Sequence, residues 1–310
     1  MYTAKPRAIR AIWKEQWPLF ALMLPGLLAF LLFCYVPFYG ILMAFKNYNP
    51  LKGVWGSAWV GWANFTYIFA LPSFTNALRN TVAIGALKLL FCYPLPIVFA
   101  LMLNEIRLVR LKRTIQTISY LPHFISWVVA AGIWYRLLSP SSGIVNAILV
   151  ATGILHEPIN FVGEPNMFYG LLIFTDVWKE LGWNAIIYLA AITSINPELY
   201  EAARVDGANR LQQVWHITLP GIKSTMLLMF IMAVSNLLNV GFDQIYNMMN
   251  DVVREVGDVL DTLIMRTLTV GSMRDMSLGT AMGILKNSVA LLLFLLANGV
   301  SRGLFRESLL

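Results

Sequence analysis

The sequence predicts an all-α membrane protein with six transmembrane helices and both termini in the cytosol. Hydrophobic residues make up 58% of the 310 residues and charged residues only 13%, whereas soluble domains carry about 25% charged residues. Six apolar segments reach the roughly 20 residues that cross about 30 Å of hydrocarbon at 1.5 Å per residue. Basic residues gather in alternate connections between these segments, which is typical of a multi-pass membrane protein.

The six predicted spans contain few charges. The first lacks any charged residue, exceeds the length of a signal-peptide core and is followed by no small-residue cleavage site, so we expect an uncleaved span. A shorter apolar run, 143–155, favours an interfacial or re-entrant helix. Four prolines within spans are expected to kink or unwind them: Pro25, Pro37, Pro94 and Pro96. The spans are 19–45, 81–103, 115–138, 168–195, 225–245 and 278–300.

The distribution of charge predicts the orientation. Six spans place residues 1–18, 104–114, 196–224 and 301–310 on one side, and these stretches hold thirteen basic and six acidic residues. The other side holds seven basic and eight acidic residues, so the basic side is predicted to be cytosolic. It accounts for the whole net charge of +7, and no nucleic-acid partner is needed to explain that charge.

The connection between the fourth and fifth spans is the most polar stretch of its length. Pro197 and Glu198 follow Asn196 in the order typical of a helix start, with the acid in the first turn. Gly207 then turns the chain at low steric cost. Apolar residues of a second short helix follow at helical spacing: Leu211, Val214 and Trp215. We expect a helix-turn-helix on the cytosolic surface whose protruding elbow docks into a partner.

This connection also contains an ungapped pattern of nine residues: Glu201, Ala202, Ala203, Asp206, Gly207, Ala208, Ile217, Leu219 and Pro220. The pattern resembles the EAA loop of the inner-membrane permease subunits of ATP-binding-cassette importers. Arg210 also agrees with the carbohydrate-importer branch, whereas Ser224 stands where many members carry proline. The alternative is an ordinary amphipathic surface loop.

Three further segments resemble the oligosaccharide and polysaccharide permease subgroup: 120–129, 188–191 and 258–262. The resemblance covers nearly the whole chain. It implies the type I ABC importer permease fold, with a cytosolic segment over 1–18, a permease domain over 19–310 and a coupling loop over 196–222. It also implies translocation of an oligosaccharide or polysaccharide, with acidic polymers such as alginate among the candidates.

The resemblance implies partners in the bacterial inner membrane. In the family, the EAA loop enters a groove on a separate ATPase subunit. This chain has no phosphate-binding G-x-x-x-x-G-K-[ST] loop, so ATP and Mg²⁺ are expected on that subunit, with no cofactor here and no enzymatic activity. The implied partners are a second homologous permease, two ATPase subunits, a periplasmic or lipoprotein solute-binding protein, the carbohydrate and membrane lipid.

Charged residues within the spans are candidates for the substrate pathway, because a charge in hydrocarbon costs on the order of 3 kcal/mol or more. Lys88, Asp176 and Lys286 each lie seven or eight residues inside the outer end of a span, roughly 11 to 12 Å deep. We therefore expect one water-filled cavity shared by three helices, and expect Lys286→Ala to lower uptake more than abundance. The other candidates are Lys179, Glu180, His123, Trp178, Asn184, Asn236, Asn239 and Asn287.

Structural roles are an alternative for the same charges. Asp176, Lys179 and Glu180 are close enough along one helix to pair with one another, and the other lysines could extend to the headgroups. His123 beside Pro122 is typical of a hydrogen-bonding residue at a helix end. Neither a metal-ligand spacing nor a nucleophile-base set is present. A stand-alone secondary transporter or channel is the alternative function, but the inverted repeats and coupling-ion site it needs are not found.

Overall fold

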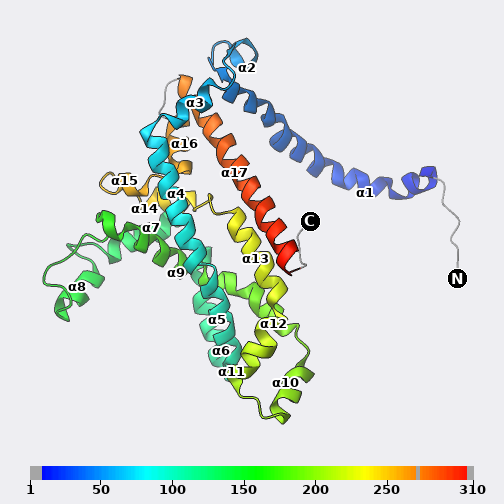
Figure 1. Ribbon diagram of the computed structural model, residues 1–310, viewed down its shortest axis with the longest axis vertical. Helices are drawn as coiled ribbons and strands as arrows, with labels where there is room; N and C mark the ends of the chain where they lie inside the picture. The colour runs from blue at the N-terminus through cyan, green and yellow to red at the C-terminus, as the bar shows by residue number, and fades with distance from the viewer. Residues whose placement is uncertain (1–8, 270–272, 306–310) are drawn as a thin grey trace.

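The computed structural model describes residues 9–269 and 273–305. Long helices run between two ends of an elongated molecule (Figure 1). One end carries α2 (Gly53–Gly56) and α3 (Ala63–Phe69). The opposite end, here called the loop end, carries α10 (Pro197–Val205) and α11 (Arg210–Gln213).

The first predicted span is helical throughout but irregular. Helix α1 (Ile9–Phe30) passes through Pro25 and continues as a π-helix, Leu31–Tyr35, and a 3₁₀-helix, Val36–Phe45. Loss of the proline N–H and local rewinding explain such irregularity. Residues 16–38 are exposed along this span, which extends away from the other helices (Figure 1). Its apolar surface therefore needs a cover from outside the chain.

A small hairpin follows the first span and was not predicted. Strand β1 (Lys46–Asn47) pairs antiparallel with β2 (Ala58–Trp59), and Lys46 lies opposite Trp59. The Lys46 ammonium donates to the carbonyl of Val54 at 2.8 Å. Trp59 stacks on Phe45 with ring centroids 5.7 Å apart, so the hairpin is fixed to the end of the span.

The second span consists of two helices, as its prolines predict. Two residues, Cys92 and Tyr93, separate the end of α4 (Pro72–Phe91) from the start of α5 (Pro94–Glu105). Pro94 disfavours helical geometry in the residue before it and supplies no N–H. The α5 helix packs along α9 (Pro165–Thr193), which forms the predicted fourth span.

The expectation of one uninterrupted helix over 115–138 is wrong. Helix α6 (Val109–Tyr120) gives way to a 3₁₀ turn, Leu121–Phe124, before α7 (Trp127–Leu137) begins. Pro122 lies in the turn, and the Ser126 side chain accepts a bond from the Val129 N–H to cap α7. The short helix expected near 143–155 is present as α8 (Ile144–Ala151).

The fifth span is also interrupted. Helix α13 (Lys223–Ser235) ends well before α14 (Phe242–Met248), so the helix expected over 225–245 is broken at 236–241. Gly241 has φ +91°, in the region that favours glycine. The sixth span is one helix, α17 (Met273–Phe305). The remaining helical segments are a π-helix, Val214–Thr218, and the helices α12 (Leu219–Gly221), α15 (Arg254–Gly257) and α16 (Leu260–Thr269).

Three helical stretches in the described ranges are long and apolar enough to cross a membrane: Gln16–Phe45, Pro72–Glu105 and Asp275–Arg302. A fourth candidate is the pair Arg210–Gly221 and Lys223–Ser235, bent by 63°. The helix α9 is long but carries three charges in its middle, and the third span is split. The predicted third and fourth spans are therefore not among these candidates.

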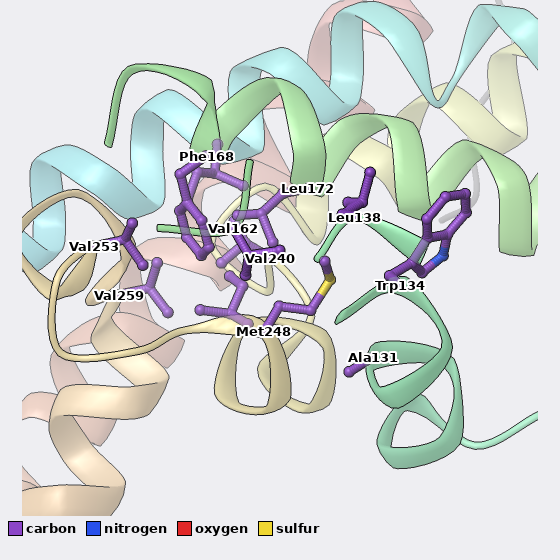
Figure 2. Close-up of a cluster of buried hydrophobic side chains, with 12 residues drawn as sticks. Ala131, Trp134, Leu138, Val162, Phe168, Leu172, Val240, Met248, Val253 and Val259 are labelled. Carbon is purple, nitrogen blue, oxygen red and sulfur yellow. The ribbon is translucent and has the colours of Figure 1, made fainter. Parts of the chain in front are cut away.

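A buried apolar cluster fixes the broken fifth span against α9 (Figure 2). Phe168 and Leu172 of α9 meet Val240 from the break and Met248 from α14. Phe168 and Leu172 are fully buried. Because this packing surrounds the break, the interruption is a defined part of the fold.

The span-five break also lies against α4 at Gly85. An added Cβ at Gly85 would lie 2.1 Å from the Leu237 carbonyl oxygen, whereas Gly170 of α9 has open space. We predict that Gly85→Ala destabilises the protein by about 1–3 kcal/mol through overpacking. Thermal unfolding in detergent measures the loss, and Gly170→Ala is the control. Equal melting temperatures for the two variants would contradict this close contact.

Candidate functional site

The loop end presents a rigid elbow built from local capping interactions. The Asn196 side chain accepts from the Glu198 N–H at 3.1 Å and starts α10. Helix α10 ends in a Schellman motif. The Gly207 N–H donates to the Arg204 carbonyl, and the Ala208 N–H donates to the Ala203 carbonyl. Gly207 has φ +81°. The predicted turn at Gly207 is thus confirmed, together with the helix start at Pro197.

The second arm of the elbow is fixed at both ends. Asn209 and Gln212 form a reciprocal capping box at the start of α11, at 2.9 and 2.7 Å. The buried Gln213 side chain donates to the Ala208 carbonyl at 3.0 Å. Tyr200 and Thr218 join the two arms through their hydroxyl groups at 2.9 Å. The two arms therefore form one unit.

The elbow projects from the molecule and exposes apolar surface (Figure 1). Val205 is 88% exposed and Leu211 67% exposed. One ion pair joins the elbow to the membrane helices, because Arg210 Nη1 lies 2.9 Å from Glu105 Oε2 at the end of α5. The nine residues of the predicted motif all belong to this elbow and its second arm: Glu201, Ala202, Ala203, Asp206, Gly207, Ala208, Ile217, Leu219 and Pro220.

A pocket of about 360 Å³ with largely apolar walls and several polar side chains lies among the helices. Its walls come from α4, α5, α9, α13 and the span-five break. The pocket also contains the apolar side chains of Met229 and Met232 and the ring of Tyr188. Five of the predicted pathway residues line it: Lys88, Asp176, Asn184, Asn236 and Asn239.

An ion pair with a buried support lies in the pocket wall. Lys88 Nζ lies 2.8 Å from Asp176 Oδ1 and donates to Gln244 Oε1 at 2.7 Å. Gln244 is fully buried, and its amide donates to the Leu172 carbonyl at 2.6 Å and to the Thr175 hydroxyl at 2.9 Å. This network joins α4, α9 and α14. Lys88 therefore pairs within the protein and does not extend to the headgroups.

A second polar cluster holds the broken third span to α9. His123 Nδ1 lies 2.7 Å from Glu180 Oε2, and Lys179 Nζ donates to the His123 carbonyl at 2.6 Å. Lys179 also pairs with Glu180 at 3.2 Å, as one sequence alternative proposed. His123 stacks on Trp183 with ring centroids 4.2 Å apart. The histidine therefore acts as a hydrogen-bonding residue at a helix end.

The remaining predicted residues lie outside the pocket. Trp178 packs edge-on against Trp134 at 5.2 Å, beside the apolar cluster of Figure 2. Lys286 of α17 is buried and lies 2.5 Å from Asp261 of α16, and Asn287 is exposed. The helices therefore bring Lys88 and Asp176 to one pocket but place Lys286 elsewhere, because α16 supplies an acid to pair with it.

Sequence reasoning missed three partners of these charged groups. Gln244 was assigned to a transmembrane helix and drew no notice as a neutral residue. Asp261 lies in the 258–262 segment, whose spacing alone does not identify Lys286 as its partner. Glu105 and Arg210 were both counted as cytosolic charges. The sequence did carry a signal for this pair, because the two residues have opposite charges and lie on the same predicted side of the membrane.

The elbow, the broken spans and the pocket with its ion pair define a membrane component of a transport system that works with separate subunits. A family model described as "Binding-protein-dependent transport system inner membrane component" matches residues 93–306. The chain belongs to this family, and it is a multi-pass protein of the inner membrane.

Two relatives from Bacillus subtilis (strain 168) match almost the whole chain. The polygalacturonan/rhamnogalacturonan transport system permease protein YteP is 42% identical, over 95% of this chain and 91% of the relative. Protein LplB is 40% identical, over 96% of this chain and 92% of the relative. Each alignment thus covers more than nine tenths of both chains.

Two solved structures share the fold. One is a bacterial ABC transporter involved in the import of the acidic polysaccharide alginate, with 40% identity, a TM-score of 0.87, and coverage of 96% of this chain and 99% of that one. The other is a bacterial alginate ABC transporter in complex with alginate pentasaccharide-bound periplasmic protein. Its identity is 38% and its TM-score 0.88, with coverage of 97% and 99%. The chain has the fold of the ABC importer permease.

The placement of Lys286 reverses the expectation for Lys286→Ala. We predict that this variant loses stability, because it leaves the partly buried Asp261 carboxylate unpaired, at a cost below that of breaking a fully buried pair, which is about 3–5 kcal/mol. Membrane abundance and melting temperature should fall, while uptake per folded molecule stays close to wild type. Lys286→Met combined with Asp261→Leu should recover stability. Normal abundance with selective loss of uptake would contradict the prediction.

Proposed function

We propose that this chain is one membrane-spanning subunit of an ATP-binding-cassette importer that translocates an oligosaccharide or polysaccharide delivered by a solute-binding protein. The relatives that support this substrate class transport polygalacturonan or rhamnogalacturonan in one case and alginate in another. Both kinds of polymer carry carboxylates. We therefore propose an acidic saccharide as the substrate.

The proposed topology has six spans and cytosolic termini. The second, third and fifth spans each count once despite their breaks. The charge distribution supports placing the loop end in the cytosol, because basic residues prevail in the stretches that this orientation puts there. In this orientation α2, α3 and the hairpin lie on the side where the solute-binding protein delivers the saccharide.

The observation that carries the proposal is the rigid, exposed elbow around Gly207. Its two arms are capped and joined to each other, and its apolar side chains, such as Val205 and Leu211, lie in solvent. A surface of this kind fits into a groove on another protein. We propose that the groove belongs to an ATPase subunit that binds ATP and Mg²⁺, while this chain binds no cofactor and catalyses no reaction.

A related second permease supplies part of the missing cover for the first span. Residues 16–38 are exposed in the single chain, and lipid contacts only the outward side of a helix in an assembled bundle. We propose that the partner permease packs against the inward side of α1. The saccharide pathway then lies between the two permeases, with Asn184, Asn236 and Asn239 of this chain able to donate to sugar hydroxyls.

Glu201→Ala tests the elbow. We predict that ATP-dependent uptake falls about tenfold or more, because the change removes a charge from the docking surface. The membrane helices should stay intact. The measurement is uptake of a galacturonate oligosaccharide into proteoliposomes that contain all subunits. Glu198→Ala, in the first turn of the same helix, is the matched control and should remain close to wild type.

Two outcomes would contradict the proposal. Wild-type uptake by Glu201→Ala, with the ATPase still bound, would remove the coupling role of the elbow. Uptake by this chain alone, in liposomes without ATP or partner subunits, would favour a stand-alone transporter.

A further inference from the structure

We propose that the Lys88–Asp176 pair is the charge filter of the pathway, and that Lys88 is a specificity-determining residue for acidic saccharides. The inference rests on the proposed function and deepens it. It concerns which charged group in the pocket contacts a carboxylate and what keeps that group from attracting every anion.

Lys88 retains the capacity for one more hydrogen bond. A lysine ammonium has three N–H donors, and Lys88 uses one for Asp176 and one for Gln244 in the described part of the chain. Gly241 leaves space beside the ammonium, because a Cβ there would lie 3.2 Å from Nζ. Lys88 and Asp176 both line the pocket and keep 17% and 16% of their side-chain surfaces exposed. A saccharide oxygen can therefore reach the ammonium without displacing Asp176.

Gln244 keeps the ammonium in place during such a contact. Its amide is buried and bonded to two groups of α9, so its carbonyl oxygen has a fixed position. The Lys88 side chain is thus held from two directions, by a carboxylate and by a rigid amide. A preorganised donor of this kind selects ligands with little loss of side-chain entropy.

The charge of the pocket depends on this pair. The other lysines within the spans pair with acids elsewhere, Lys179 with Glu180 and Lys286 with Asp261. Lys88 and Asp176 together contribute no net charge, so the wild-type wall binds a carboxylate through a local donor and not through a general positive field. Neutralising either residue changes the net charge of the pocket wall by one unit, and the two changes have opposite signs.

The test measures binding in the assembled transporter without its solute-binding protein. The chain has two cysteines, Cys34 and Cys92, and Cys92 lines the pocket beside Asp176, so a label there would report the substitution as well as the saccharide. Both cysteines are replaced by serine, and the exposed pocket residue Met232 is replaced by cysteine. The rate of maleimide labelling of this Met232→Cys reporter is recorded against increasing saccharide. The probes are trigalacturonate and its fully methyl-esterified form, which has similar size but no charge. Each variant is compared with its own unprotected rate.

Opposite shifts are expected from the two single variants. Asp176→Asn should lower the half-protecting concentration of trigalacturonate about tenfold, and Lys88→Gln should raise it about tenfold or more, because one unit charge acts across a few ångströms of partly shielded pocket. For the methyl ester, the half-protecting concentration should change by less than about threefold in both variants. Lys88→Arg should keep the wild-type preference. The double variant Lys88→Gln/Asp176→Asn is expected to bind both probes about equally.

Controls separate a filter from a structural pair. Lys286→Gln and Asp261→Asn alter a pair outside the pocket and should leave the ratio between the two probes unchanged. Parallel shifts of both probes in Lys88→Gln and Asp176→Asn would overturn the filter while leaving the importer function intact. If neither probe protects the Met232→Cys reporter while Lys88 and Asp176 are intact, the pocket is not a saccharide site and the filter is also refuted. The double variant, which buries no unpaired charge, keeps the test decisive if a single variant misfolds.

Discussion

Pairing of charge inside the apolar region is the constraint on which the arrangement of the helices depends. An unpaired charge there is costly, and breaking a buried pair costs more than the pair contributes. Two pairs join separate helices: Lys88 and Asp176 link α4 to α9, and Lys286 and Asp261 link α17 to α16. Lys179 and Glu180 together hold the turn at His123 against α9. The ion pairs thus set which helices are neighbours.

The same polar groups make the helix breaks tolerable. Backbone N–H and C=O groups freed by a break need partners where water is excluded. At the third span, the Lys179 ammonium bonds to the His123 carbonyl at the turn. At the fifth span, Gln244 of α14 donates to the Leu172 carbonyl and the Thr175 hydroxyl of α9, which holds the helix after the break against its neighbour. The breaks and the polar side chains therefore belong to one design, which a regular helix bundle would not require.

Hydrophobic length and local capping signals predicted much of this fold. The elbow follows from Asn196, Pro197 and Gly207, because caps and turns depend on adjacent residues. The break at 236–241 could not be predicted, because packing against Gly85 and α9 stabilises it and those contacts are distant in sequence. The partner of Lys286 was missed for the same reason. Charge types were visible in the sequence, but their pairing depends on the tertiary structure.

The elbow has a mechanical consequence for the helix above it. Its capped arms make it stiff, and the Arg210–Glu105 contact joins it to the end of α5. A displacement of the elbow would therefore rotate α5 as a lever of about 18 Å, the length of its twelve residues. The pivot of that rotation is the interruption of the helix at Cys92 and Tyr93, one helical turn from Lys88. A small movement at the loop end would thus change the pocket wall without bending any continuous helix.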